Sequence, residues 1–438
     1  MSNFPAHPIQ EETMHRRTLL GLGLAAVAVT ATGCSRSEGG SGATAQQPSQ
    51  PTTIKFFTDK AAWEPSFTEM NKASAAINTS LAFTGYSDPT AYDSFVKQSF
   101  RTKKVPDLFT WHTGAQLAEL VDQKLVSKTT DLWQQATGSK LVPEGLIDNY
   151  TYGGEQYGVP LNIAYWAMYY NKKVFDQYNL KPPTTWAELM TICDTLLRNG
   201  VTPFHQMNTI FEFVWFQLLL IGESPETYQK LQTGKAKYTD PEVVRAATRW
   251  GEMIDKKYFV DPGEKTDPQT LLNTGKCAMA YFGTFFTGQL TGIGAKSGTD
   301  YGIFLPPNVN PAVTRPQVVL ESGPMLTGSN AENEAAALAY SQWWFGDDAQ
   351  KAWSNARGDI SFNPNVQPTD PELKALVDRI NDGAQNIEVQ KRYLEATPLP
   401  IYTTETEVFG KFVTEGGDPM PYLKQLQDSA DKYWAENP

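Results

Sequence analysis

From about residue 53 onward, two patterns of apolar residues alternate along the chain: short continuous runs, and residues that recur at helical spacing. Short apolar runs at residues 53–58, 105–111 and 276–282 are typical of strands, whereas the apolar residues within 117–125 recur at helical spacing. Strands that alternate with helices of this length predict an α/β architecture.

Capping residues mark where several helices begin. Thr185 followed by Glu188 predicts a capping box, and Asp240 and Asp267 are each followed by a proline at the expected first helical position. From about Ser329 onward the pattern is mostly helical. The strand-and-helix part is therefore followed by a helix-rich C-terminal region.

The first 33 residues predict an export signal. Arg16 and Arg17 precede an apolar segment that is too short to span a bilayer, so a cleaved signal peptide is favoured over a membrane helix. The segment ends in ATGC, which resembles the lipobox of bacterial lipoproteins and makes Cys34 the expected lipid-bearing residue. The arginine pair resembles a twin-arginine signal. Twin-arginine and general export both stay open, as does the choice between Met1 and Met14 as the start.

Residues 34–53 are the expected lipidated cysteine followed by a tether. Gly, Ser, Gln and Pro dominate this segment, and it shows no apolar periodicity. Such a composition predicts a flexible chain with an end-to-end distance of roughly 25 Å.

Length and charge narrow the class of protein. A chain of 438 residues with 40% hydrophobic residues is expected to fold as two lobes or domains. Its net charge of -11 repels phosphate backbones, so nucleic acid is not an expected partner.

Cysteine and histidine are too few to suggest a metal or a cofactor. Cys193 and Cys277 each lie in an apolar pattern typical of a buried thiol, and free cysteines are favoured over a disulfide. Beyond the signal segment the only histidines are His112 and His205, which are not at ligand spacing. We expect neither a metal site nor a cofactor.

The usual catalytic motifs do not occur. There is no G-x-S-x-G or H-E-x-x-H, and the one G-x-G-x-x-A match lies within the signal segment. A glycosidase needs only two carboxylates, so a secreted carbohydrate-active enzyme remains one alternative. Arg357-Gly358-Asp359 leaves a surface adhesion protein as another, although so short a motif is common by chance.

Many aromatic residues lie beside predicted strand ends or turns. A ring in such a place offers an apolar face to the C–H face of a sugar, while neighbouring carboxylates and amides bond its hydroxyls. For any one ring, core packing is favoured over ligand binding, so only the joint order of the rings points to a sugar site. These residues are Trp63, Trp111, Trp166, Phe211, Trp215, Phe285, Phe286 and Tyr402.

Several segments, taken in order, resemble the sugar-binding family of bacterial ABC-importer solute-binding proteins, the family that includes maltose-binding protein. They are IKFF with TDKAAW, VPDLFTWHTGAQLAELVDQKLV, YGVPLNIAYWAMYYNKKVF, PPTTWAEL, TGKCAMAYFGTFF, VVLESGPMLTGS and GDISFNPNV. The resemblance implies a two-lobed periplasmic-binding-protein-like fold with a ligand cleft between lobes. Three hinge crossovers are then expected near Ile163, near Val319 and within 358–364.

The resemblance also implies the domains and the function. Residues 51–163 with 319–358 form the expected N-terminal lobe, and 164–318 with 359–438 the C-terminal lobe. The expected protein is a monomer that binds a neutral mono- or oligosaccharide at the outer face of the membrane, anchored through Cys34. It delivers the sugar to the ABC permease subunits by hinge closure, and it is not an enzyme.

Ligand-binding residues are carried over from the same resemblance. Carboxylates among them are expected to accept hydroxyl hydrogen bonds, and Phe285 stands where the family most often has a tryptophan. The absence of an arginine cluster favours a neutral sugar. The full set is Asp59, Trp63, Trp111, His112, Thr113, Asn162, Tyr165, Phe211, Glu212, Trp215, Phe285, Glu321, Ser322, Gly323, Arg357, Asp359 and Tyr402.

The run LNIAYWAMYYNKKVF spans the first expected crossover. Strand alternation puts Met168 and Tyr170 on the side of Trp166, and Tyr165 on the other side. Most of the run is expected to be core. Asn162 and Tyr165, beside the crossing, are the positions expected to meet a sugar.

Overall fold

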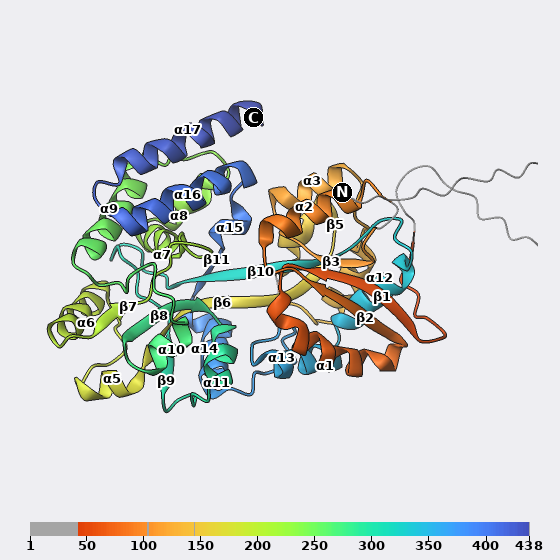
Figure 1. Cartoon of the computed structure of the whole chain (residues 1–438), viewed down its shortest axis with the longest axis horizontal. Coiled ribbons are helices and arrows are strands. Elements are labelled where there is room, and N and C mark those ends of the chain that lie inside the picture. Colours follow the sequence, from red (N-terminus) through yellow and green to blue (C-terminus); the bar gives the residue numbers. More distant parts are fainter. Residues whose placement is uncertain (1–42, 103–104, 144, 438) are drawn as a thin grey trace, which may run out of the picture. The chain divides into compact units, whose positions relative to one another are not determined.

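A computed structural model describes residues 43–102, 105–143 and 145–437 (Figure 1). The predicted signal peptide and Cys34 lie outside these residues. The described chain has two groups of helices on one mixed sheet, which confirms the predicted α/β class.

One sheet of nine strands runs through the described residues. Most of its strands form the path β2 (Thr79–Gly85), β1 (Thr52–Thr58), β3 (Leu108–Thr110), β10 (Gln317–Thr327), β6 (Val159–Asn171), β8 (Cys277–Gly283) and β7 (Thr202–Phe204). In addition, β11 (Glu388–Lys391) pairs with β10, and β9 (Tyr301–Phe304) pairs with β6. A separate short pair consists of β4 (Thr151–Tyr152) and β5 (Glu155–Gln156).

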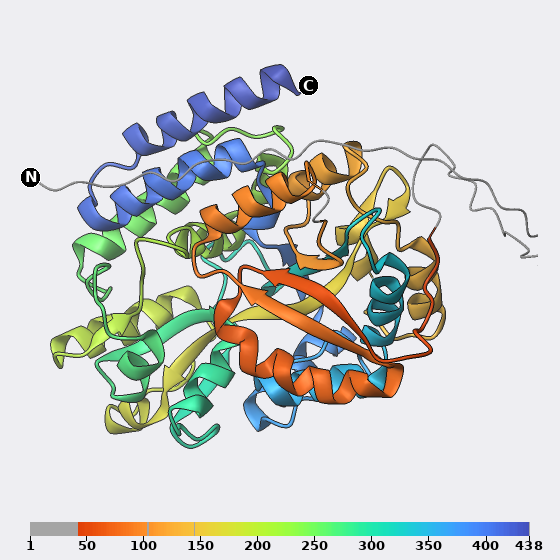
Figure 2. The same cartoon turned by 45° about the vertical axis from the view of Figure 1, so that its right-hand side comes forward.

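We call the half built on β1, β2 and β3 the first lobe. Its helices are α1 (Glu64–Ser74), α2 (Pro89–Ser99), α3 (Ala115–Asp122), α4 (Thr130–Gly138), α12 (Glu334–Trp344) and α13 (Asp347–Arg357), with short 3-10 turns at Ala61–Trp63, Ala75–Ile77 and Leu146–Tyr150. Trp133, Trp344 and Trp353 are fully buried in its core. Because α12 and α13 return to this lobe late in the chain, α13 lies beside α1 (Figure 2).

The second lobe contains β7, β8 and β9 with the remaining helices. They are α5 (Lys172–Gln177), α6 (Trp186–Arg198), α7 (Val214–Glu223), α8 (Pro225–Leu231), α9 (Pro241–Asp255), α10 (Pro268–Asn273), α11 (Phe286–Gly292), α14 (Pro371–Asn381), α15 (Tyr393–Ala396), α16 (Leu399–Glu415) and α17 (Met420–Glu436), with a 3-10 turn at Gly383–Gln385. All residues of α7 are buried, as expected of a helix at the centre of a core. The C-terminal helices α16 and α17 lie side by side (Figure 1).

Two long antiparallel strands, β6 and β10, join the lobes. Their pairing runs from Trp166 opposite Val319 to Val159 opposite Met325, with an irregularity between Gly323 and Pro324. Beyond this ladder β6 pairs with β8 and β9 of the second lobe, and β10 pairs with β3 of the first. The two strands therefore carry the chain between the lobes.

The predicted helix starts are confirmed, but not all of the predicted caps. At Thr185 the capping box is complete, with Glu188 N–H donating to its hydroxyl at 3.2 Å. Asp240 precedes α9 as predicted, yet its carboxylate accepts from Lys237 N–H at 2.8 Å instead of capping the helix. Asp267 likewise forms no side-chain cap. A proline at the first helical position has already removed one N–H there, which lowers the need for a cap.

The predicted tether is too long at its C-terminal end. Gln46 N–H donates to the Ala335 carbonyl at 3.1 Å, and Asn78 Nδ2 donates to the Pro48 carbonyl at 3.0 Å. Ala45 packs against the first lobe's core. Backbone hydrogen bonds need no apolar periodicity, which is why composition alone assigned these residues to a free segment.

Two further features bear on the predictions. Cys193 and Cys277 are both buried and free. Within the described part of the chain, no helix has the length and apolar content needed to cross a membrane.

Candidate ligand-binding site

The site is built around one face of the β6–β10 ladder. Residues paired directly across the ladder share a face, and neighbours along a strand alternate. Glu321 is paired with Ala164 and Gly323 with Asn162, so these residues share a face with Trp166. We call this the Glu321 face.

Gly323 leaves the Glu321 face open. A Cβ atom added to Gly323 would meet no atom within 4 Å. Asn162, directly opposite, is buried. The strand backbone is thus accessible at this point, beside a side-chain amide that can both donate and accept.

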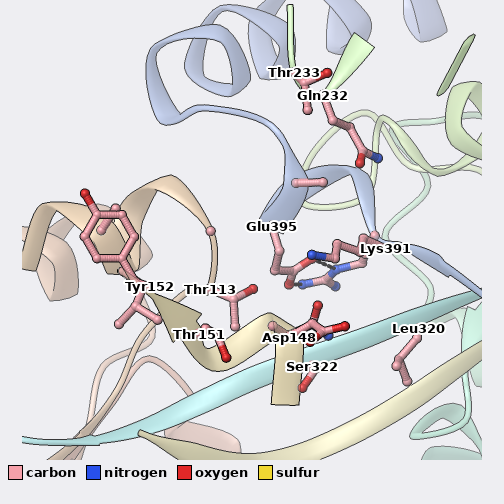
Figure 3. A pocket seen from close by; sticks show the side chains of 16 residues that line it. Thr113, Asp148, Thr151, Tyr152, Gln232, Thr233, Leu320, Ser322, Lys391 and Glu395 are labelled. Carbon is pink, nitrogen blue, oxygen red and sulfur yellow. Dashed lines mark hydrogen bonds and ion pairs between the residues drawn. The ribbon is translucent and has the colours of Figure 1, made fainter. Parts of the chain in front are cut away.

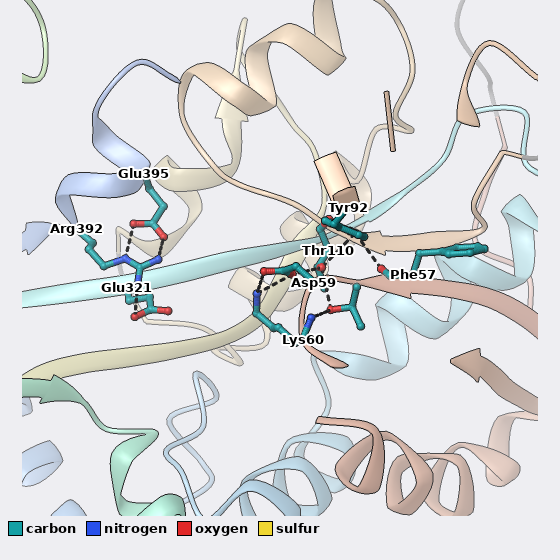
Figure 4. Close-up of polar contacts among 9 residues, drawn as sticks. Phe57, Asp59, Lys60, Tyr92, Thr110, Glu321, Arg392 and Glu395 are labelled. Atoms are coloured by element: carbon teal, nitrogen blue, oxygen red, sulfur yellow. Dashed lines mark hydrogen bonds and ion pairs between the residues drawn. The ribbon is translucent and has the colours of Figure 1, made fainter. Parts of the chain in front are cut away.

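A buried ion cluster lies on the second lobe's side of this face (Figure 4). Arg392 Nη1 is 2.8 Å from Glu321 Oε2, and Trp166 Nε1 donates to the same oxygen at 3.0 Å. Arg392 also forms a two-pronged contact with Glu395, in which Nε donates to Oε2 at 2.8 Å and Nη2 to Oε1. Burial by itself lowers the pKa of Arg392, but the two carboxylates outweigh it and raise the pKa. The guanidinium therefore stays charged and fixes Glu321.

The first lobe contributes a second ion pair at the end of β1 (Figure 4). Lys60 Nζ lies 2.9 and 2.8 Å from the two oxygens of Asp59, and Thr110 Oγ1 donates to Asp59 at 2.8 Å. Burial raises the pKa of Asp59, but Lys60 prevails and lowers it to about 2. His112 follows β3 nearby; burial lowers its pKa, and the charges of Asp59 and Glu395 oppose this. These groups from both lobes are close enough to affect one another's charge.

Trp63 and Arg357 form a cation–π pair in the first lobe. The Arg357 guanidinium lies 4.0 Å from the Trp63 ring centroid, and both residues are half-buried. Asp359, two residues on, is buried, and burial raises its pKa to about 7 even though Ile360 N–H donates to it at 2.7 Å. The charge of Glu321 also contributes to that rise, so the α13 end lies near the Glu321 face.

Aromatic rings of the second lobe surround Trp166. Phe211 and Phe285 meet it edge-on, at centroid distances of 5.3 and 6.1 Å, and stack on each other at 6.3 Å. Both phenylalanines are half-buried, whereas Trp166 is 1% exposed. Within this cluster, Phe211 and Phe285 are thus the rings with surface that is accessible to a ligand.

The structure does not place Glu212 as a ligand contact. Its side chain is fully buried, and burial raises its pKa to about 7. Glu405 of α16 is also fully buried; its pKa is raised by burial and then by the charge of Glu212. No hydrogen bond of standard geometry from a described residue reaches their four carboxylate oxygens, although the Thr406 hydroxyl is near enough to oppose the rise at Glu212. Tyr402, half-buried on the same helix, lies near both.

Two tryptophans expected to bind ligand are core residues. Trp111 is 4% exposed and donates its indole N–H to the Gln116 carbonyl at 3.1 Å. Trp215 is 1% exposed and donates to the His205 carbonyl at 3.1 Å. Both rings are buried and both indole N–H groups are already hydrogen-bonded within a lobe, so neither is available to a ligand.

Tyr165, Ser322 and Thr113 are not on the Glu321 face. Tyr165 is paired with Leu320, so it shares the opposite face with Ser322, and it is buried in a core cluster. Ser322 Oγ is hydrogen-bonded to Tyr150 Oη at 2.5 Å. Thr113 and Ser322 instead line a cavity of about 350 Å³ on that opposite side (Figure 3).

Residues from both lobes line this cavity. Asp148 and Thr151 come from the first lobe, and Gln232 and Lys391 from the second (Figure 3). At its edge the lobes touch closely, because a Cβ added to Gly114 would lie 2.3 Å from the Glu395 carbonyl oxygen. The inter-lobe region is therefore hollow on this side of the ladder, where Arg392 and Glu395 also line the cavity.

Sequence reasoning missed four residues of the site: Lys60, Trp166, Arg392 and Glu395. Trp166 was named among the candidate rings but left out of the ligand set, because most of its run was expected to be core, and Lys60, beside Asp59, was not considered. The spacing of Arg392 and Glu395, three residues apart at a helix start, was a signal for an ion pair, but nothing in the sequence put it next to Glu321.

The fold and this arrangement define a two-lobed binding protein whose lobes meet around a pair of crossing strands. Residues 66–379 match the profile of the bacterial extracellular solute-binding protein family, and the chain belongs to that family.

Known proteins agree with this assignment. An ABC transporter extracellular-binding protein of Pyrococcus horikoshii is 22% identical over 330 residues, which is 71% of each chain. A chitin oligosaccharide binding protein has a similar structure, with a TM-score of 0.76 and 17% identity over 87% of this chain and 98% of that one. A structure from work on xylan utilization by Caldanaerobius polysaccharolyticus has a TM-score of 0.74 and 19% identity over 86% and 99%. At these identities the structures show a shared fold.

Proposed function

We propose that this protein binds a neutral mono- or oligosaccharide and delivers it to the permease of an ABC importer. The observation that carries the proposal is the Glu321 face, where exposed parts of Phe211 and Phe285 lie near hydrogen-bonding groups and the open backbone at Gly323. The chitin-binding and xylan-related structures of the same fold support a carbohydrate as ligand.

The proposed ligand contacts come from both lobes. Asp59, His112 and Asn162 are the polar contacts on the side of the first lobe and the ladder, and Phe211 and Phe285 are the apolar ones on the second. Trp63, Glu321, Gly323, Arg357, Asp359 and Tyr402 complete the set. A sugar that bridges these groups favours the state in which the lobes are closest, which is the basis of hinge closure.

The lobes in this proposal keep the boundaries expected from the sequence. Residues 51–163 with 319–358 move against 164–318 with 359–438. The ladder of β6 and β10 and the segment 358–364 act as hinges. The permease recognises the closed form.

We further propose that the protein carries out binding without chemistry. The carboxylates best placed to meet a sugar are already neutralised, Asp59 by Lys60 and Glu321 by Arg392. A glycosidase needs one carboxyl free to give a proton and another free to attack or activate water. Salt-bridged carboxylates suit hydroxyl recognition better.

The location is part of the proposal. Residues 1–33 are proposed to be a signal peptide, and Cys34 to carry a lipid that holds a monomer at the outer face of the membrane. Because Ala45 and Gln46 contact the first lobe, the proposed linker between the lipid and the folded chain is shortened to residues 35 to about 44.

A thermal-shift screen of the mature chain with Cys34→Ser tests the function. A sugar present at a hundred times its dissociation constant is expected to stabilise the protein by about 2.7 kcal/mol and to change its tryptophan fluorescence. Unchanged melting across a broad panel of neutral sugars contradicts the proposal. Release of reducing ends from an oligosaccharide replaces it with the glycosidase alternative.

A further inference from the structure

The backbone at Ile210 is unusual for its residue type. Its φ is 69°, in the left-handed region that β-branched residues strongly avoid. Eight described non-glycine residues have positive φ, and the other seven are asparagine or lysine. Ile210 is therefore the one β-branched residue of the described chain held in this conformation.

The strain is imposed by a tight turn with fixed ends. Phe211 N–H donates to the Thr209 carbonyl at 2.8 Å, which closes a three-residue turn around Ile210. With positive φ at its centre, such a γ-turn is rare and strained. On one side the Asn208 carbonyl oxygen is packed so closely on α16 that a Cβ at Gly410 would lie 2.8 Å from it. On the other side Phe211 is held by its stacking on Phe285.

The Ile210 side chain is too exposed for packing within the fold to offset this strain. It is 63% exposed, the highest value among the large hydrophobic residues in the described chain. Single exposed apolar residues are ordinary. An exposed isoleucine on backbone suited to asparagine or glycine is not, because neither packing nor local sterics favours it.

We propose that Ile210 is a ligand contact that helps to set specificity. It directly precedes Phe211, so the turn presents an apolar side chain beside the aromatic part of the Glu321 face. There it would pack on the C–H face or a methyl group of a sugar and disfavour ligands with a charged substituent at that place. This inference rests on the proposed function.

Two substitutions at Ile210 and one control test it in the mature chain with Cys34→Ser. Ile210→Gly and Ile210→Asn both accept positive φ, so the melting temperature without ligand is expected to rise by about 1–3 °C. The same variants are expected to bind the responding sugar about tenfold more weakly. Ile293→Asn is the matched control, because Ile293 is 43% exposed but has an ordinary φ of -94°. Its sugar affinity is expected to match that of the wild type.

The outcomes separate this inference from the function it rests on. If the wild type binds a sugar and the Ile210 variants bind it equally well, the inference is overturned and the function stands. If affinity falls only together with a lower melting temperature, Ile210 is merely structural and the inference again fails. If the wild type binds no sugar in titrations with xylo-oligosaccharides, chitin oligosaccharides and simple hexoses, both fail.

Discussion

Two clusters of buried carboxyl groups lie beside the site, and they differ in having a cation. Glu321 and Glu395 share Arg392, whereas Glu212 and Glu405 have no positive partner among the described residues. Burial penalises the charged form in both places. Burial raises the pKa of Glu321, and Arg392 opposes that rise and holds the carboxylate in place, whereas in the second pair no cation opposes the rise. Burial with a cation therefore yields a clamp held by Arg392 in one place, and burial without a cation yields a proton-sensitive pair in the other.

The largest effect is expected from removing the cation of the first cluster. Arg392→Met leaves two buried carboxylates unpaired and is expected to lower the free energy of unfolding by about 3–5 kcal/mol, measured by urea denaturation. Adding Glu321→Gln and Glu395→Gln is expected to restore most of the loss. Lys374→Met, which breaks an exposed pair with Asp378, is the control and should cost less than about 1 kcal/mol. A cost for Arg392→Met as small as that of the control would contradict the clamp.

The second cluster is expected to make stability depend on pH. Burial raises the pKa of Glu212 from 4.5 to about 7 in the folded protein. The contribution of Glu212 to the free energy of unfolding is therefore complete below the unfolded-state pKa, and it is lost as the pH rises through the folded-state pKa. The wild type should therefore lose about 2–3 kcal/mol more between pH 5 and pH 8 than the variant with Glu212→Gln and Glu405→Gln. The measurement is urea denaturation at each pH.

Neighbours of this pair do not titrate in that range. Tyr238, Tyr393 and Tyr402 are the other titratable groups that interact with it, and burial raises the pKa of each above its usual value. Glu407→Gln, on the exposed side of the same helix, is the matched control and should leave the pH profile unchanged. If the free energy of unfolding changed with pH in the same way in the wild type and the double variant, protonation of Glu212 and Glu405 in the folded protein would be ruled out.

A smaller effect is expected at the hydrogen bond that ties Trp166 to the first cluster. Trp166→Phe keeps the aromatic contacts but removes the donor to Glu321 Oε2, at an expected cost of about 1–2 kcal/mol in the free energy of unfolding. In the Arg392→Met, Glu321→Gln, Glu395→Gln background the same substitution should cost less. Equal costs in the two backgrounds would show that the indole N–H does not act through Glu321.

Much of the fold was predictable because its signals are local. The capping box at Thr185, the strand of residues 276–282 and the alternation of Trp166 and Met168 against Tyr165 all follow from spacing alone. The length of the tether was not predictable, because Gln46 binds a carbonyl far away in the sequence.

The site was harder to predict because it depends on which face of each strand is used. Period-two alternation separates Tyr165 from Trp166 but does not say which of them faces the ligand. That depends on the pairing of β6 with β10, a contact between distant segments. Trp111 and Trp215 were misassigned for a related reason: a sequence does not show that their indole N–H groups are already bonded within a lobe.

The central claim is that a sugar binds on the Glu321 face, and isothermal titration calorimetry of Gly323→Val tests it most directly. The added side chain projects into open space, so the melting temperature should stay close to that of the wild type while affinity for the responding sugar falls by about a hundredfold or more. Leu320→Met, on the opposite face of the same strand, should leave affinity unchanged. Unchanged affinity in Gly323→Val, with affinity lost in Leu320→Met, would contradict the account and move the site to the cavity behind the ladder.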